Sequence, residues 1–397
     1  MKRRNSKTSS AATASPTALT DARPHRAGAK ASQRAGAILE IDLDAIAENF
    51  TKLAERVGAK VRVGAVVKAD AYGLGIEKVA PALARAGAKT FFVATLDEGL
   101  ALRELLPRAQ IAVLNGLVMG APADFAKAAL TPVLNDLGQV AVWQDYAAKR
   151  GGAPAMLHLD TGMARLGLPP KETQQLIAEP NRLEGFALAL ILSHLACASE
   201  AAHPLNDTQL DAFHAALKHL PSAPASLAAS SGVFLGGDFL FELVRVGAAL
   251  YGVNPTPGRP NPMKQVVRLK AKILQLRDVD RGESVGYGAA HRIEKPTRIA
   301  TIAMGYADGW LRSSSQRGSA HIAGKPAPVV GQISMDLVTL DVTGHDPANL
   351  VPGTYVDLLD ERYGVDDAAL AAQTIGYEIL TSLGSRFHRV YRGGGGR

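Results

Sequence analysis

A lysine followed by small residues and glycines is the stretch of this chain best suited to chemistry. Lys68 ends the apolar run of residues 65–67 and precedes a segment with two glycines at residues 69–75. An amine at the carboxyl end of a buried strand faces a loop where backbone can approach a phosphate. Apolar surroundings disfavour its ammonium form and make it a better nucleophile. Such a lysine suits a Schiff base with pyridoxal phosphate, although the spacing equally allows an amine that merely extends to solvent.

Other polar and charged side chains follow predicted strands in the same way. They are Tyr72, Asp160, Arg165, Ser193, His194, Ser230, Ser231 and Arg245. Taken one at a time, each fits a structural role, such as a paired loop arginine, a buried core histidine or a turn serine. In a barrel of parallel strands, however, the carboxyl ends of the strands meet at one mouth. A lysine, two arginines and a histidine there predict a cationic pocket for an anion with a phosphate and a carboxylate.

Strands and helices alternate up to about residue 250. Apolar residues recur at steps of three and four over 43–57, which predicts a helix that Asp42 or Asp44 caps and Gly58 ends. Buried strands are expected at 61–68, 91–95, 111–115, 132–135, 155–159, 186–192, 225–229 and 243–246, and further helices at 76–87, 97–106, 121–129, 137–150, 171–178 and 205–220. Roughly eight such units in about 220 residues favour an α/β fold of the (β/α)8 TIM-like barrel type over an open sheet.

The pattern changes after about Pro262. The β-rich runs beyond it are 299–303, 320–322, 329–333, 337–342 and 355–358, with a helix expected only over 367–383. Glycines and prolines separate these runs, which is typical of a mostly antiparallel β domain. We therefore expect a disordered basic tail at 1–36, a barrel domain at 37–258 and a C-terminal β domain at 259–397. The proline-rich segment 254–263 is the expected linker.

Composition excludes several classes of protein. The chain has 397 residues, 47% apolar and 20% charged, and no apolar run of about 18 residues that would predict a membrane span. Its net charge of +7 comes from residues 1–36, which hold eight Lys or Arg and one acid, leaving 36 basic and 36 acidic residues in the body. The balanced body predicts no nucleic-acid partner. The single cysteine, Cys197, fits a reducing cytoplasm.

The sequences of several predicted loops resemble motifs of the alanine racemase family. VVKADAYGLG at 66–75 is similar to that family's cofactor-lysine motif, DTGMARLG at 160–167 to its substrate-arginine loop, SHLACASE at 193–200 to its histidine segment, and RVGAALYG at 245–252 to the segment facing the cofactor ring. The resemblance covers residues 38–392. It implies a barrel followed by a β domain, pyridoxal 5'-phosphate as cofactor, and interconversion of L- and D-alanine.

The resemblance also implies how the cofactor would be held. Its binding residues would be Lys68, Tyr72, His194, Ser231, Arg245, Gly247, Ala248 and Tyr377. Lys68 would carry the cofactor covalently, and Arg245 would face its pyridine nitrogen. Because a guanidinium only donates hydrogen bonds, Arg245 would keep that nitrogen unprotonated. The ring is then a weaker electron sink, which disfavours transamination and decarboxylation.

Catalysis would use two bases on opposite faces of the substrate. The resemblance implies Lys68 for one face and Tyr287 of a partner subunit for the other, so a homodimer with shared active sites is expected. Arg165, the backbone at Met335 and Tyr306 at the entrance would meet the substrate, and no metal is implied. The product would supply D-alanine for peptidoglycan, or the reaction would serve alanine catabolism.

Three residues depart from the family pattern. His158 stands where many relatives have a lysine that orients the substrate arginine, and it could act as a hydrogen-bonding substitute. Ser230 replaces an asparagine in the phosphate loop, and Ser334 replaces a cysteine before the substrate-binding backbone.

Two other functions compete with this interpretation. One is racemisation of another small amino acid such as serine, or a decarboxylation, on the same architecture. The other is a cofactor-carrier barrel without catalysis. Such carriers lack a second domain, so residues 263–392 argue against that alternative.

Overall fold

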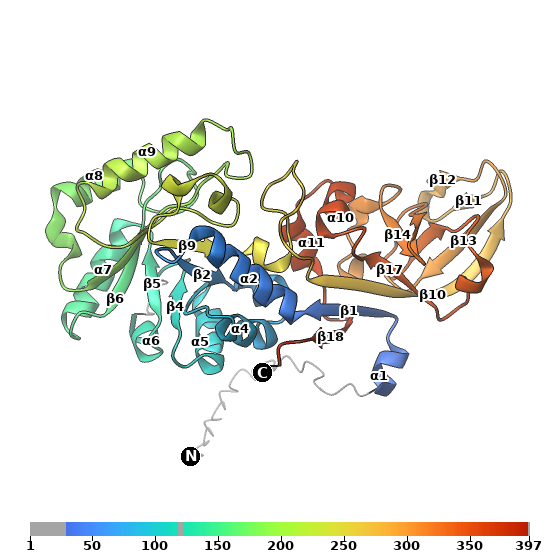
Figure 1. The fold of residues 1–397 in the computed structure, drawn as a ribbon, viewed down its shortest axis with the longest axis horizontal. Coiled ribbons are helices and arrows are strands. Elements are labelled where there is room, and N and C mark those ends of the chain that lie inside the picture. The colour runs from blue at the N-terminus through green and yellow to red at the C-terminus, as the bar shows by residue number, and fades with distance from the viewer. Residues whose placement is uncertain (1–28, 118–121, 396–397) are drawn as a thin grey trace, which may run out of the picture.

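The computed structural model describes residues 29–117 and 122–395, which form two lobes side by side along the long axis (Figure 1). Residues 1–28 of the tail, which was predicted to be disordered, lie outside the described residues. Within the expected tail, α1 (Ala29–Arg34) is helical, and the Tyr355 hydroxyl donates to the Ser32 and Ala35 carbonyls beside it. Alanine has the highest helix propensity, and this docking adds to it.

The first lobe is a barrel of parallel strands. Its strands are β2 (Arg62–Val66), β3 (Thr90–Val93), β4 (Gln110–Val113), β5 (Thr131–Leu134), β6 (Pro154–His158), β7 (Ala187–Leu192), β8 (Ala225–Ser226) and β9 (Leu243–Val246). They pair in the order β8-β7-β6-β5-β4-β3-β2-β9, and a bridge between Ala229 and Arg245 nearly completes the ring. The predicted (β/α)8 barrel is confirmed.

Helices surround this barrel at the expected places. They are α2 (Leu43–Val57), α4 (Ile76–Arg85), α5 (Leu96–Leu105), α6 (Pro122–Lys127), α7 (Leu137–Ala148), α8 (Pro170–Ala178) and α9 (Leu205–Leu217). The predicted caps of α2 are present, because the Asp42 carboxylate accepts from the Ala45 amide and Gly58 has a φ of 79°. Only short 3-10 turns follow the last two strands: η2 (Gly232–Phe234), η3 (Gly237–Phe239) and η4 (Ala248–Tyr251).

The second lobe is a mostly antiparallel sheet. Its strands are β1 (Ala37–Asp42), β10 (Val267–Val279), β13 (Thr297–Ile302), β14 (Ser319–Ile322), β15 (Lys325–Pro328), β16 (Val338–Asp341), β17 (Tyr355–Leu359) and β18 (His388–Arg392). The long strand β10 organises it by pairing with β1, β13 and β17. A separate hairpin joins β11 (Ser284–Val285) to β12 (His291–Arg292). The predicted architecture of this domain is confirmed.

Several details differ from the sequence-based expectations. The chain enters through β1, which lies in the range expected for the barrel but pairs antiparallel with β10 and parallel with β18. Neither β1 nor β18 was expected, because pairing between the two ends of a chain leaves no local signal. Residues 329–333 form no strand beyond one bridge. The expected final helix is broken into α10 (Val365–Ala372) and α11 (Gly376–Ser382), since Gln373 between them is left-handed at φ 57°.

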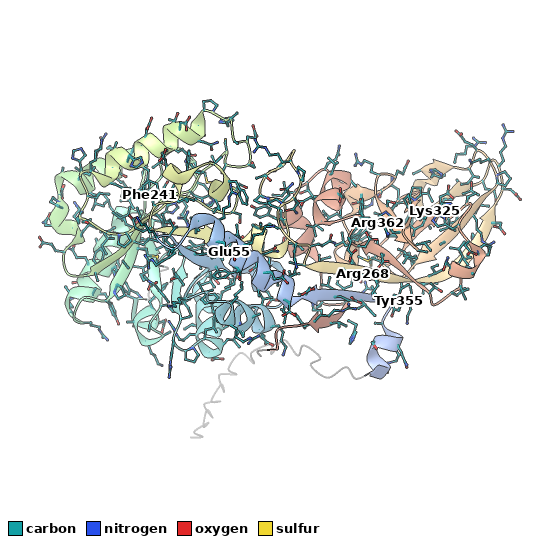
Figure 2. The ribbon with its side chains drawn as sticks, viewed as in Figure 1. Glu55, Phe241, Arg268, Lys325, Tyr355 and Arg362 are labelled. Carbon is teal, nitrogen blue, oxygen red and sulfur yellow. The ribbon has the colours of Figure 1, made fainter. Side chains whose placement is uncertain are left out.

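Burial follows the two lobes. Phe91, Phe92 and Val93 of β3 are fully buried, as expected of a parallel strand covered on both faces. In Figure 2, Phe241 lies on the barrel lobe, whereas Arg268 and Arg362 lie on the second. None of the helices in the described part of the chain is long and apolar enough to cross a membrane.

Candidate active site

The segment after β2 has an unusual backbone. Lys68 opens a turn labelled α3 (Lys68–Tyr72), but residues 69–72 all have φ between 54° and 56°. Four successive non-glycine residues in the left-handed region cost roughly 1–2 kcal/mol each, so neighbouring contacts must hold this turn. Lys68 was expected to end a strand, whereas β2 ends two residues earlier. The lysine therefore projects from a strained turn at the barrel mouth.

The Lys68 amine lies in an environment that favours its neutral form. The side chain is half-buried, and burial lowers the pKa of the Lys68 amine below its usual value. The positive charge of Arg165 lowers this pKa further, whereas the carboxylate of Glu98 acts in the opposite direction. A lysine with a lowered pKa has more free amine near neutral pH and is the better nucleophile.

A cavity of about 670 Å³ opens beside Lys68 at the carboxyl ends of the strands. It brings together most of the residues that the sequence predicted for the site: Lys68, Tyr72, Arg165, His194, Arg245, Gly247, Ala248 and Tyr377. Ser231 does not line it, whereas the neighbouring Ser230 does. The cavity combines a lysine, two arginines and aromatic hydroxyls, so it suits a small anionic ligand.

Arg245 of β9 is the buried charge of this cavity. Its guanidinium donates to the Ser226 carbonyl and hydroxyl and to the Ser193 carbonyl, and it lies 3.4 Å from Nδ1 of His194. Burial lowers the pKa of Arg245 to about 10, which still leaves the group charged at neutral pH. These acceptors hold the planar guanidinium in one orientation.

The two histidines of the cavity are neutral. Burial lowers the pKa of His194 to about 3, and Arg245 and Arg165 lower it further in that order. Burial likewise lowers the pKa of His158 to about 4, with Arg245 the next cause. A neutral imidazole can both donate and accept, so these rings can link charged neighbours without adding charge.

One wall of the cavity is formed by Ser230, the start of η4 and two tyrosines. The Ser230 hydroxyl accepts from the amides of Gly247 at 3.0 Å and Ala249 at 3.2 Å, which fixes the start of η4. A Cβ at Gly247 would overlap the Tyr72 hydroxyl, so only glycine lets backbone and tyrosine approach this closely. The ring of Tyr377 of α11 lies 6.0 Å from that of Tyr72, centroid to centroid, and is tilted by 49° against it. The sequence predicted Ser231 for this wall, whereas the structure places the neighbouring Ser230 there.

Arg165 is held by the loop after β6. The Asp160 carboxylate accepts from the amides of residues 162, 163 and 164, which folds the loop immediately before the arginine. Its guanidinium is exposed on the rim of the cavity, where it can reach a carboxylate.

His158 bonds to a residue that sequence reasoning did not single out. Its Nδ1 lies 2.8 Å from Oδ1 of Asn135, and the Asn135 amide group donates to the carbonyls of Leu114 and Val133. Those two bonds orient the Asn135 oxygen toward the ring, so Nδ1 of His158 is the donor and Nε2 is free to accept. A polar residue at the end of the predicted strand 132–135 was the available signal.

Three predicted residues lie outside this cavity, on the second lobe. Tyr287, Met335 and Tyr306 are 71%, 54% and 42% exposed, which is unusual for large apolar side chains. They occupy adjoining segments, because the amide of Tyr306 donates to the Ser334 carbonyl and the Gly331 turn contacts Val285. None of the three is among the residues that line the cavity with Lys68.

Both lobes match domains of known proteins. The model of the alanine racemase N-terminal domain matches residues 41–255, and that of the C-terminal domain matches residues 266–391. An alanine racemase of Rhodospirillum rubrum is 49% identical over 363 residues, covering 91% of this chain and 97% of that protein. A catabolic alanine racemase of Mesorhizobium japonicum is 48% identical over 362 residues, covering 91% and 94%.

Solved structures agree with these sequence matches. The crystal structure of alanine racemase from Bartonella henselae with covalently bound pyridoxal phosphate is 44% identical, with a TM-score of 0.87, covering 90% of this chain and all of that one. The biosynthetic alanine racemase of Pseudomonas aeruginosa is 33% identical with a TM-score of 0.84, covering 90% and 100%.

Fold and site together define an enzyme built from a (β/α)8 barrel and a β domain, with a lysine in a cationic cavity at the barrel mouth. The chain belongs to the alanine racemase family. The family, the fold and the enzyme class predicted from the sequence are confirmed.

Proposed function

We propose that this protein is a pyridoxal 5'-phosphate-dependent racemase that interconverts L- and D-alanine. The observation that carries the proposal is the half-buried Lys68 amine beside a glycine-lined cradle and two arginines. The covalently bound cofactor of the Bartonella henselae relative supports it. The single cysteine, Cys197, fits a cytoplasmic location.

The residues present fit this cofactor. The absence of a Cβ at Gly247 leaves room for the Tyr72 hydroxyl, and the amides of Gly247 and Ala249 donate to the Ser230 hydroxyl on the same wall. Tyr72 and Tyr377 add hydroxyls beside it. We propose that this wall binds the phosphate, that Lys68 binds the aldehyde carbon, and that Arg245 donates to the pyridine nitrogen.

When bound, pyridoxal phosphate withdraws electrons from the substrate's Cα and makes its proton acidic. The protein then has to hold the ring and move one proton. Arg245, which only donates, keeps the ring nitrogen unprotonated and so favours return of the proton to the same carbon. Arg165 at the rim binds the substrate carboxylate and fixes its orientation.

Racemisation needs a base on each face of Cα. Nζ of Lys68 serves one face, and we propose that the hydroxyl of Tyr287 from a second copy serves the other. The exposure of Tyr287, Tyr306 and Met335 supports this arrangement, because a partner that covered them would complete the site. The functional unit is then a homodimer.

Two measurements on the purified chain test the function. A visible absorption band after addition of pyridoxal phosphate, fixed on Lys68 by borohydride, would support the cofactor. Formation of D-alanine from L-alanine in a chiral product assay would support the reaction. Faster turnover of serine or release of carbon dioxide would contradict it, and a chain that stays colourless would overturn the cofactor assignment.

A further inference from the structure

The left-handed turn that carries Lys68 needs an external restraint. Residues 69–72 all have positive φ, and no side chain caps the turn at Val67. Conformations of this kind persist only where surrounding contacts enforce them. The amide of Ala69 is the backbone group directly after the lysine, so its partner controls where the lysine starts.

That partner is Glu98 in the first turn of α5. Its Oε1 accepts from the Ala69 amide at 2.6 Å, while its Oε2 accepts from the amides of Ala94 at 2.7 Å and Thr95 at 3.2 Å. One carboxylate thus joins the carboxyl end of β3, the start of α5 and the turn after β2. Hydrogen bonds to an ionised acceptor are shorter and stronger than neutral ones.

Glu98 also supplies the charge that opposes Arg165 at the lysine. The Arg165 guanidinium lowers the pKa of the Lys68 amine, and the Glu98 carboxylate raises it. Because the carboxylate is held by three amides, its charge stays at a fixed place beside the turn. The Glu98 carboxylate therefore both restrains the turn after Lys68 and places a negative charge near the amine.

We propose, resting on the proposed function, that Glu98 is a positioning residue that fixes the Lys68 turn against α5 through the Ala69 amide. A glutamine at this position has one oxygen and one amino group, so it cannot accept from both sides. Glu98→Gln therefore loses a hydrogen bond and the charge at almost constant shape. Glu98→Asp keeps the charge but shortens the reach.

Helix capping is the competing role, and the chain offers a matched control for it. The Thr95 hydroxyl accepts from the Glu98 amide at 3.3 Å and completes the cap of α5. Thr95→Ala weakens that cap and leaves the carboxylate of Glu98 in place. A purely structural role for Glu98 predicts that both variants behave alike.

Two readouts that do not depend on turnover separate these roles. The first is hydrogen–deuterium exchange of the peptide spanning residues 67–75 in the full-length chain. We expect Glu98→Gln to speed exchange at Ala69 about tenfold, since a charge-assisted hydrogen bond is lost, and Thr95→Ala to leave it unchanged.

The second readout is the pH profile of the rate at which the cofactor-free full-length chain captures pyridoxal phosphate. Loss of the carboxylate disfavours the ammonium, so the midpoint for Glu98→Gln should move to lower pH by about 0.5 unit or more. Glu98→Asp should restore the midpoint of the parent, and Thr95→Ala should match it.

Equal exchange rates and equal midpoints for the parent and Glu98→Gln would overturn this inference but leave the proposed function standing. So would identical changes in Glu98→Gln and Thr95→Ala. If Glu98→Gln fails to fold, Glu98→Asp is measured in its place. An unshifted midpoint in Glu98→Asp would support the electrostatic effect of the carboxylate on Lys68. Exchange at Ala69 as slow as in the parent would overturn the proposed restraint through the Ala69 amide. A parent chain that captures no pyridoxal phosphate would overturn the proposed function, and this inference with it.

Discussion

Individual side chains in this site are held in one orientation by their hydrogen bonds. Arg245 is 4% exposed and donates to Ser226 and Ser193, so its charge is compensated by neutral acceptors rather than by a carboxylate. The planar fork of arginine matches these acceptors, and an ammonium on a lysine cannot reach both of them. The residue type is therefore set by geometry as well as by charge.

We expect Arg245→Lys to lower the free energy of unfolding by about 2–3 kcal/mol, because buried carbonyls lose their donors. Urea unfolding followed by circular dichroism measures the change. Arg277→Lys is the control, since Arg277 is exposed and its guanidinium donates to the Gln275 side chain at the surface. Equal stabilities of the two variants would show that the buried fork contributes nothing.

His158 predicts a pH dependence of stability. Burial lowers its pKa in the folded protein to about 4, below the value near 6.5 of an unfolded chain. The unfolded state therefore takes up the proton first, and stability is lost as pH falls from about 6.5 toward 4. In His158→Gln, the loss of unfolding free energy between about pH 7 and pH 5 should be smaller by about 2 kcal/mol. Urea titrations at the two pH values measure it, and parallel curves for parent and variant would contradict it.

At the scale of elements, short backbone segments build the proposed phosphate wall. Gly247 precedes η4, and a Cβ at this position would meet Tyr72 and Val66 of the neighbouring strand–turn unit. The approach of β9 to β2 leaves no room for a side chain, so the packing of two parallel strands decides the residue here.

We expect Gly247→Ala to displace the Tyr72 ring and to weaken retention of pyridoxal phosphate at least about tenfold, since overpacking costs about 1–3 kcal/mol. Equilibrium dialysis followed by absorbance measures the bound cofactor. Gly237→Ala is the matched control, because nothing lies within 4 Å of a Cβ there. If both variants retained the cofactor like the parent, the cradle would lie elsewhere.

At the scale of the whole molecule, the two proposed bases do not line the same cavity of one chain. Lys68 lines the barrel cavity, whereas Tyr287 lies on the exposed hairpin region of the second lobe. A symmetric dimer in which each second lobe meets the other barrel would bring the two groups together twice.

Mixed dimers test this arrangement. We expect Lys68→Ala and Tyr287→Phe each to lack racemase activity, and their co-expression to restore about a quarter of the parent activity, since half of randomly paired dimers carry one intact site of two. Chiral product assays measure it, and sedimentation checks that all samples are dimers. A mixture that stays inactive would mean that each site belongs to one chain.

Much of the fold followed from local patterns. The apolar period of α2, its Asp42 cap and the alternating units up to β9 were predictable because each signal lies within a few residues. The strand pairing of β1 with β10 and β18 was not, since it joins segments more than 200 residues apart. The break at Gln373 was not predictable either, because glutamine is a good helix former and its propensity gives no signal for a left-handed residue.

By itself, the sequence determined the residue types at the strand ends and their order, from Lys68 and Arg165 to Arg245. The functional group of each side chain follows directly from its residue type. Tertiary structure alone decided the left-handed turn under Lys68, the hydrogen bond that the Ala69 amide donates to Glu98, and the pairing of His158 with Asn135. These depend on how distant strands and helices approach one another, and a hydrogen bond between them exists only once the barrel has formed.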